Sequence, residues 1–174
     1  MKTDHLVLTF GSIVLLVGSA VLGDQNKIAA SRDNTLFSES TSSGGVATTF
    51  ISGRTNGGAL RRTLMQFDVA GRVPAQAIVT SAVLTIHLDG VSSTETQARD
   101  MALYRIAADW GEGVSGGGGA GGGQGQPPTT GDATWLHSMF DTALWSTPGG
   151  VFVSTSSAVT TVGMAIDFYQ WPST

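Results

Sequence analysis

The sequence predicts an all-β fold, an antiparallel β-sandwich of the jelly-roll type. Apolar and polar residues alternate with a period of two over several short segments, which is the pattern of half-buried strands. Glycine-rich turn sequences, such as Asn56-Gly57-Gly58 and Pro148-Gly149-Gly150, separate these segments. After the N-terminal segment, no window of eleven or more residues has the spacing of an amphipathic helix. Short strands joined by glycine-rich turns are typical of a sandwich.

The clearest strand signal lies in the middle of the chain. In Thr80–Asp89, the residues Ala82, Leu84, Ile86 and Leu88 fall on one face of the predicted strand. The other predicted strands are Lys27–Ala30, Thr48–Ser52, Arg61–Val69, Asp100–Ala107, Val151–Thr155 and Val159–Phe168. Turn-forming residues predict breaks near the start of the domain at Arg32-Asp33-Asn34 and Ser42-Ser43-Gly44-Gly45.

The first 23 residues are expected to form an export signal. Lys2 precedes an apolar run, Leu6–Leu22, and polar residues follow from Asp24 onward. A basic start, an apolar stretch and small residues before a cleavage point after Gly23 are the features of a signal peptide. An uncleaved membrane anchor is the alternative, although a run of 17 residues is at the lower limit of the ~17–25 that span a bilayer. The sequence thus predicts an extracellular or cell-surface protein, with no stable membrane insertion once the signal is cleaved.

Residues 24–174 are expected to form one domain, because a domain usually has roughly 100–200 residues. The segment Ser115–Gly131 holds a run of glycines followed by glutamine and proline. Glycine at this density loses much backbone entropy on ordering. We therefore expect 115–131 to be a flexible loop inside the domain, with β-like sequence resuming after it.

Composition excludes several functional classes. The chain has nine Lys and Arg against thirteen Asp and Glu, a formal net charge of −4, and so lacks the basic footprint of a nucleic-acid-binding protein. It has no cysteine, which excludes disulfides, thiolate nucleophiles and cysteine-ligated metals. Export without disulfides is more typical of a bacterial protein than of a eukaryotic secreted one.

Two patterns contain residue types that occur in active sites. The segment Gly113–Gly117 fits G-x-S-x-G, but a nucleophile elbow needs a strand before it and a helix after it, which a glycine run does not provide. The carboxylates Asp109, Glu112 and Asp132 flank the glycine-rich loop and are the candidates for a polysaccharide hydrolase or lyase. Solvated or turn-capping acids are the simpler interpretation of these three residues.

Calcium is the one cofactor that the sequence leaves open. Asp33 and Asn34, or Asp109 together with Asp132, would supply hard oxygen ligands of the kind that calcium prefers. His87 and His137 lie far apart and lack the spacing of a zinc site. No other cofactor is expected.

Several motifs in order along the chain resemble one known family. They are Asp33-Asn34-Thr35-Leu36, Gly53-Arg54-Thr55-Asn56, Arg61–Val69, Val73–Ile86, Arg105–Gly113, Gly131–His137 and Trp145–Gly150. Together they cover nearly all of residues 24–174, and they resemble the DNRLRE-domain proteins. This resemblance implies an exported β-sandwich domain of a bacterial or archaeal surface protein. Relatives of that family include a carbohydrate-binding module family that binds alginate-like polysaccharides.

Members of that family usually continue past the segment that matches Gly163–Thr174, with a short helix and a last strand. A sandwich that lacks a strand exposes an edge that can pair with another chain. We therefore expect either that the sequence is truncated on its C-terminal side or that a neighbouring subunit donates a strand.

The sequence predicts a non-catalytic exported domain that binds an acidic polysaccharide or serves as a structural unit of the cell surface. Sugar rings stack on exposed aromatic side chains, and guanidinium groups bind carboxylates or sulfates. The candidate ligand-binding residues are Arg54, Arg61, Arg62 and Trp145. The alternatives are a polysaccharide-degrading enzyme that uses the loop carboxylates, and a filament or adhesin subunit.

Overall fold

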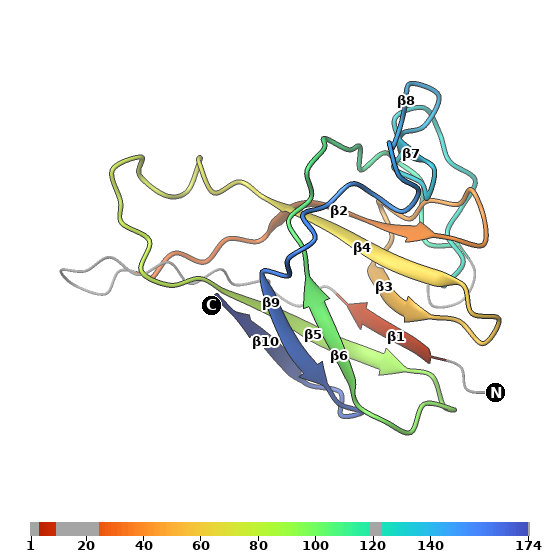
Figure 1. The fold of residues 1–174 in the computed structure, drawn as a ribbon, viewed down its shortest axis with the longest axis horizontal. Coiled ribbons are helices and arrows are strands. Elements are labelled where there is room, and N and C mark those ends of the chain that lie inside the picture. The colour runs from red at the N-terminus through yellow and green to blue at the C-terminus, as the bar shows by residue number, and fades with distance from the viewer. Residues whose placement is uncertain (1–3, 10–24, 119–122, 174) are drawn as a thin grey trace.

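The described part of the chain consists of strands and irregular connections (Figure 1). The computed structural model describes residues 4–9, 25–118 and 123–173, and these residues form ten strands and no helix. The all-β prediction is confirmed. Accordingly, the described residues include no helix that is long and apolar enough to cross a membrane.

Six strands form one antiparallel sheet in the order β10-β5-β1-β3-β4-β2. Their bounds are β1 (Asp4–Thr9), β2 (Ala30–Phe37), β3 (Thr49–Arg54), β4 (Leu60–Phe67), β5 (Val83–Val91) and β10 (Phe168–Pro172). The strand β4 pairs with β2 over its whole length but with β3 at two positions, Gly53–Arg61 and Arg54–Leu60. Beyond Arg61, therefore, β4 has no backbone pairing with β3, and the hydroxyl of Thr63 links the two strands through hydrogen bonds with Ser52 and the carbonyl of Ile51.

A second, two-stranded sheet lies over the first. It consists of β6 (Arg99–Leu103) and β9 (Ala158–Val162), which cross in front of β5 in Figure 1. A small ribbon of β7 (His137–Met139) and β8 (Ala143–Leu144) lies near the end of β2. The predicted strand Asp100–Ala107 corresponds to β6, which ends at Leu103. The predicted strand Val151–Thr155 is not a strand in the structure, where Phe152 forms a single bridge with Ile106.

Two clusters of apolar side chains hold the layers together. The first joins Phe50, Leu84 and Leu88 of the large sheet to Ala158 and Val162 of β9. The second gathers side chains of β2, β4 and the later loops: Leu36, Leu64, Trp110, Ala133 and Trp145. Burying one such side chain contributes about 1.5–3 kcal/mol, so these clusters account for much of the attraction between the layers.

Three further local predictions are wrong. Lys27–Ala30, predicted as a strand, lies outside the strands except for Ala30, the first residue of β2. Arg32-Asp33-Asn34, predicted as a turn, lies inside β2 and pairs with β4 from Gln66 to Leu64. The polar side chain of Asn34 is tolerated there because buried partners take its hydrogen bonds. The predicted strand Val159–Phe168 is two strands, β9 and β10, separated by residues 163–167.

Both termini of the glycine-rich segment are anchored. Gln126 forms a bridge with Ser43 through two backbone hydrogen bonds of 3.0 and 2.9 Å. Residues 119–122 lie outside the described residues, and the flexibility of 115–131 stays a prediction.

Within the predicted export signal, residues Asp4–Thr9 form β1, in the middle of the large sheet. Residues 1–3 and 10–24 lie outside the described part, so the signal and its cleavage stay predictions.

Candidate functional site

A groove with a volume of about 870 Å³ opens beside β4. It begins where β4 leaves β3, and its lining comes from β4, β6, the turn after β9 and the loop around Gly149. Because β4 is unpaired on this side, residues from both of its faces reach the groove. A groove of this size accommodates a small ligand or a few sugar units.

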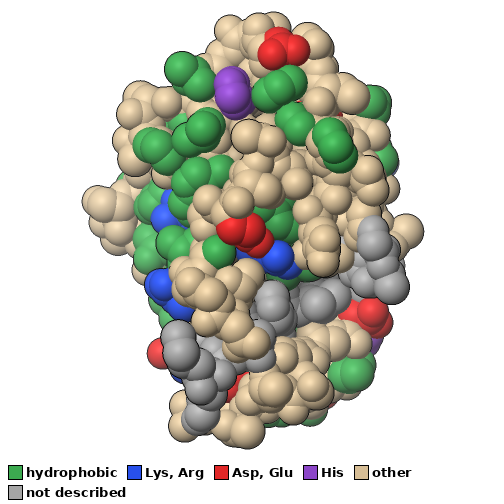
Figure 2. Space-filling view, turned by 90° about the vertical axis from the view of Figure 1, so that its right-hand side faces the viewer, with side chains coloured by type: hydrophobic (Ala, Val, Ile, Leu, Met, Phe, Trp, Pro, Cys, Tyr) green, Lys and Arg blue, Asp and Glu red, His purple; other side chains and the backbone are tan. Residues whose placement is uncertain are grey.

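The groove is positively charged although the protein is acidic. Its lining contains two carboxylates, Glu95 and Asp100, and five of the nine basic residues of the chain, which are Arg54, Arg61, Arg62, Arg99 and Arg105. Five arginines against two carboxylates give the lining a formal charge of +3 in a chain of net charge −4. On the face drawn in Figure 2, basic side chains likewise lie among hydrophobic ones.

Arg62 is half-buried and packs between two aromatic rings. Its guanidinium carbon lies 5.0 Å from the ring centre of Trp135 and 5.1 Å from that of Phe152, within range of cation–π attraction to both. Its Nη1 donates a 2.7 Å hydrogen bond to the carbonyl of Gly149. Burial lowers the pKa of Arg62 from its ordinary value and the nearby Tyr104 opposes this, but an arginine stays charged in proteins.

Gly149 makes this packing sterically feasible. Its φ of 86° lies in the left-handed region, which side-chain-bearing residues rarely adopt. A Cβ at this position would lie 2.7 Å from Nη1 of Arg62 and 2.8 Å from the ring of Trp135. The Pro148-Gly149-Gly150 sequence, predicted as a turn, therefore also sets the position of the arginine.

Two exposed aromatic rings line the groove beside Arg62. Tyr104 is 47% exposed and Phe152 is 37% exposed, and their ring centres lie 5.2 Å apart at an angle of 53°. Tyr104 directly precedes Arg105, so one short segment after β6 supplies both a ring and a cation. Exposed rings next to guanidinium groups provide the two contacts that an acidic sugar needs.

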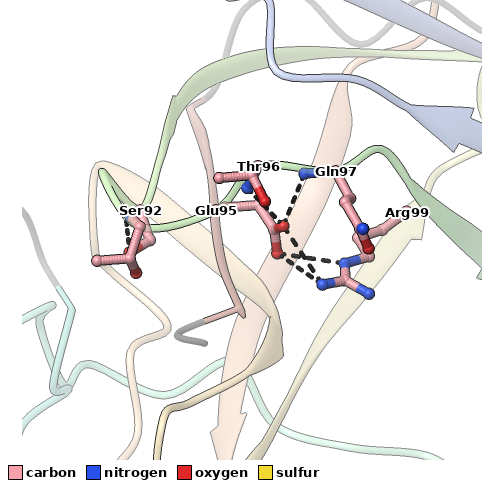
Figure 3. A network of polar contacts seen from close by, with 6 residues as sticks. Ser92, Glu95, Thr96, Gln97 and Arg99 are labelled. Carbon is pink, nitrogen blue, oxygen red and sulfur yellow. Dashed lines mark hydrogen bonds and ion pairs between the residues drawn. The ribbon is translucent and has the colours of Figure 1, made fainter. Parts of the chain in front are cut away.

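Two of the arginines are neutralised by neighbouring acids. Arg61 forms a 2.6 Å ion pair with Glu39, lies over the ring of Phe37 and also donates to a backbone carbonyl. Arg99 pairs with the buried carboxylate of Glu95, 3.1 Å away, in the network shown in Figure 3. The ion pairs reduce their availability to a ligand.

The other three arginines have no such partner. Among the residues that the structure describes, Arg54, Arg62 and Arg105 form no ion pair with a carboxylate. Arg54 is exposed and donates to the carbonyl of Gly58 at 2.9 Å. The positive charge of the groove therefore resides on these three side chains, and it is opposed by one carboxylate of the lining, Asp100, which forms no ion pair among the described residues.

Trp145 is placed away from the groove. It is 6% exposed, belongs to the second core cluster and donates from its indole nitrogen to the carbonyl of Thr134 at 2.9 Å. Since stacking on a sugar requires an accessible ring face, the structure gives Trp145 a packing role in place of the predicted ligand contact.

Asn34 has no free oxygen for calcium. Its Nδ2 donates to Ser43 and to the carbonyls of Glu112 and Ala133. Its Oδ1 accepts from the backbone of Gly44 and from Ser43. In the described ranges, no group of three or more His, Asp or Glu side chains could hold a metal ion.

Asp33, predicted with Asn34 as a calcium ligand, is 9% exposed, and its Oδ1 has no hydrogen-bond partner among the described residues. Burial, together with the smaller effect of the negative charge of Glu112, raises the pKa of Asp33 to about 7. The backbone N–H of Asp33 donates to Oε1 of Glu112 at 3.0 Å. Asp33 is therefore a buried carboxyl group beside a second one, with one oxygen unused.

The loop carboxylates of the enzyme hypothesis lie outside the groove. Asp132 accepts hydrogen bonds from the backbone of Val114 and Thr129 and from the hydroxyl of Ser115. Burial raises the pKa of Asp132, but these hydrogen bonds outweigh it and hold the pKa below its usual value. The serine of the G-x-S-x-G match is thus buried and bound to an ionised anchor, which is not the setting of a nucleophile.

Asp109 and Glu112 are also engaged. Asp109 forms a 2.9 Å ion pair with Arg32, whose hydrogen bond holds the pKa of Asp109 below its ordinary range. Glu112 accepts from the backbone of Asp33. A general acid needs a raised pKa, so Asp109 and Asp132 do not suit that role.

Sequence reasoning missed Tyr104, Arg105 and Phe152 as groove residues, and Trp135 as the ring that packs on Arg62. Tyr104-Arg105 was visible as an aromatic residue next to a cation in a predicted strand, a signal that would have found half of them. Trp135 and Phe152 come from distant segments, and only the fold brings them to Arg62. Comparison of the chain with protein-family models, with curated proteins and with solved structures gave no match.

Proposed function

We propose that the protein is a non-catalytic, exported β-sandwich domain of the DNRLRE type that binds an acidic polysaccharide in the groove beside β4. The observation that carries the proposal is the set of three arginines that have no carboxylate partner among the described residues, Arg54, Arg62 and Arg105, next to the exposed rings of Tyr104 and Phe152. A uronate or sulfate group would accept from the guanidinium groups while its sugar ring stacks on an aromatic face.

The two carboxylates that line the groove, Glu95 and Asp100, do not lie in the settings that catalytic acids need. Glu95 is held by Arg99 and by the backbone N–H groups of Thr96 and Gln97. Asp100 is exposed and accepts from the hydroxyl of Thr161. A glycosidase needs two acids with different, tuned pKa values on opposite sides of the scissile bond, and neither of these groups has such a setting.

The test compares binding of a polyuronate and of a neutral polysaccharide, by calorimetry, with two charge-matched variants. Arg105→Gln removes an exposed cation of the groove, whereas Arg72→Gln removes an exposed cation elsewhere. Arg105→Gln is expected to weaken polyuronate binding about three- to tenfold, the loss of about 1 kcal/mol from one charge-assisted contact. Arg72→Gln is expected to bind like the wild type.

Three results would count against the proposal. They are no binding of the polyuronate, an equal effect of both substitutions, and equal affinity for the neutral polymer. Release of new chain ends during prolonged incubation would instead support the polysaccharide-degrading alternative.

A further inference from the structure

The place of β1 in the sheet is a slot between two other strands. β1 pairs antiparallel with β3 over six positions, from Asp4–Arg54 to Thr9–Thr49. On its other side it pairs with β5 from Leu6–Val91 to Thr9–His87. Without β1, the edges of β3 and β5 would lie two strand spacings apart, roughly 10 Å, with a row of unpaired backbone groups on each.

The slot is bounded on both sides by strands that also pair, over part of their length, with another strand. The far edge of β5 carries β10, and the far edge of β3 meets β4. Leu8 of β1 is in register with Phe50 on one side and Leu88 on the other, and both of these belong to the first core cluster. A strand in this position therefore joins the two halves of the sheet and completes the ladder above the core.

Along the chain, β1 is connected to the other strands only after its C-terminal end, through the connection to β2. It neighbours β3 and β5, which follow it by at least forty residues, and no hairpin fixes it beside either of them. Residues 10–29 connect it to β2, whereas most connections in compact domains have about 4–6 residues. Twenty residues extend to roughly 66 Å at most, whereas a domain of this length has a radius of gyration of about 16 Å.

We propose that this slot is a strand-acceptor site through which copies of the chain join, the segment Asp4–Thr9 of one copy occupying the slot of another. The same backbone hydrogen bonds form within one chain and between two, because the acceptor edges and the donor sequence are identical. The proposal concerns the chain with residues 1–9 attached. It rests on strand pairing and not on polysaccharide binding, although Ser52, Gly53, Arg54 and Val91 both flank the slot and line the groove.

Concentration decides between the two arrangements. A donor tethered to its own slot has an effective concentration on the order of 1 mM. Dilute chains therefore fill their own slots. Chains held together at a surface above that local concentration exchange strands, and each exchange is either reciprocal, giving a dimer, or continued, giving a string of copies.

Introduced cysteines test the register directly, because the chain has none of its own. Leu6 and Ser52 are direct partners across β1 and β3. Paired residues of antiparallel strands have Cα atoms about 4.5–5.5 Å apart, which suits a disulfide. One chain carries Leu6→Cys, a second chain of different size carries Ser52→Cys, and the two are mixed from about 0.01 to about 3 mM to bracket the effective concentration.

After oxidation, the mixture is expected to yield covalent heterodimer that rises at least tenfold over this range. The matched control replaces Ser52→Cys by Ser93→Cys, an exposed position outside the pairing, and is expected to stay at background. A single chain with both Leu6→Cys and Ser52→Cys is expected to crosslink internally when dilute. Heterodimer no more abundant than in the control would overturn the proposal. So would a double variant that fails to crosslink, as it would if β3 and β5 closed directly on each other.

Discussion

The unpartnered carboxyl group of Asp33 makes stability depend on pH in a way that one substitution should abolish. In the folded protein its pKa is about 7, and in an unfolded chain it is about 3.9. Well below pH 3.9 the group is protonated in both states and has no effect on the free energy of unfolding. As pH rises towards 7 the unfolded state gains by ionising, so the free energy of unfolding falls.

The size of this effect follows from the two pKa values. The difference is roughly three pKa units, and each contributes about 1.4 kcal/mol, so the group destabilises the folded protein by up to about 4 kcal/mol above pH 7. Asp33→Asn keeps the shape and removes the charge. The expected result is that the variant becomes more stable than the wild type by an increasing margin between pH 4.5 and pH 8.

Urea unfolding at several pH values measures this margin, and Asp68→Asn, at an exposed position, controls for the loss of one negative charge. The margin for Asp33→Asn is expected to grow by about 2–4 kcal/mol over the range. A margin that stays constant within about 0.5 kcal/mol would refute the reasoning, because it would mean that Asp33 ionises alike in both states. The neighbouring carboxylate of Glu112 acts in the same direction as burial and so strengthens the expected trend.

Two further predictions concern Asn34 and Trp145, which were predicted as site residues and which the structure buries. Asn34→Ala leaves three acceptors without a donor and is expected to lower the free energy of unfolding by about 2–4 kcal/mol in urea; a loss below about 1 kcal/mol would contradict its role as a buried hub. Trp145→Phe removes one buried hydrogen bond and some packing, and is expected to lower the melting temperature by about 4 °C or more while polyuronate affinity, measured by equilibrium dialysis, stays unchanged. A selective loss of affinity would restore Trp145 to the binding site.

The parts of the fold that the sequence predicted well are those with local causes. Alternation in Arg61–Val69 and Thr80–Asp89 reports which side chains face a core, and β4 and β5 lie within or close to those ranges. The turn at Arg32-Asp33-Asn34 was predicted from residue types that favour turns when their side chains bond locally. In the structure, Asn34 bonds to groups as far as 99 residues away, so its effect on the backbone could not be read from its neighbours.

The candidate site was predicted only in part, because some of its contacts are local in the sequence and others join distant residues. Adjacent arginines in a strand must point to opposite faces, and Arg61 and Arg62 do reach different partners. Arg61 loses its free charge to Glu39, which lies two residues after the end of β2, and Arg62 packs on Trp135, which the chain supplies 73 residues later. Periodicity within one strand holds no information about either.

The distribution of charge explains how an acidic protein would attract an acidic polymer. Glu39, Glu95 and Asp109 are each paired with an arginine, and Asp132 is surrounded by donors, so these acids serve the framework. At physiological ionic strength a charge is screened beyond about 8 Å. A bound sugar carboxylate in the groove therefore responds to the arginines within that distance more than to the net charge of −4 spread over the whole molecule. Its attraction to the groove should weaken as salt is added, whereas stacking on Tyr104 and Phe152 should persist, so the salt dependence of binding separates the two contributions.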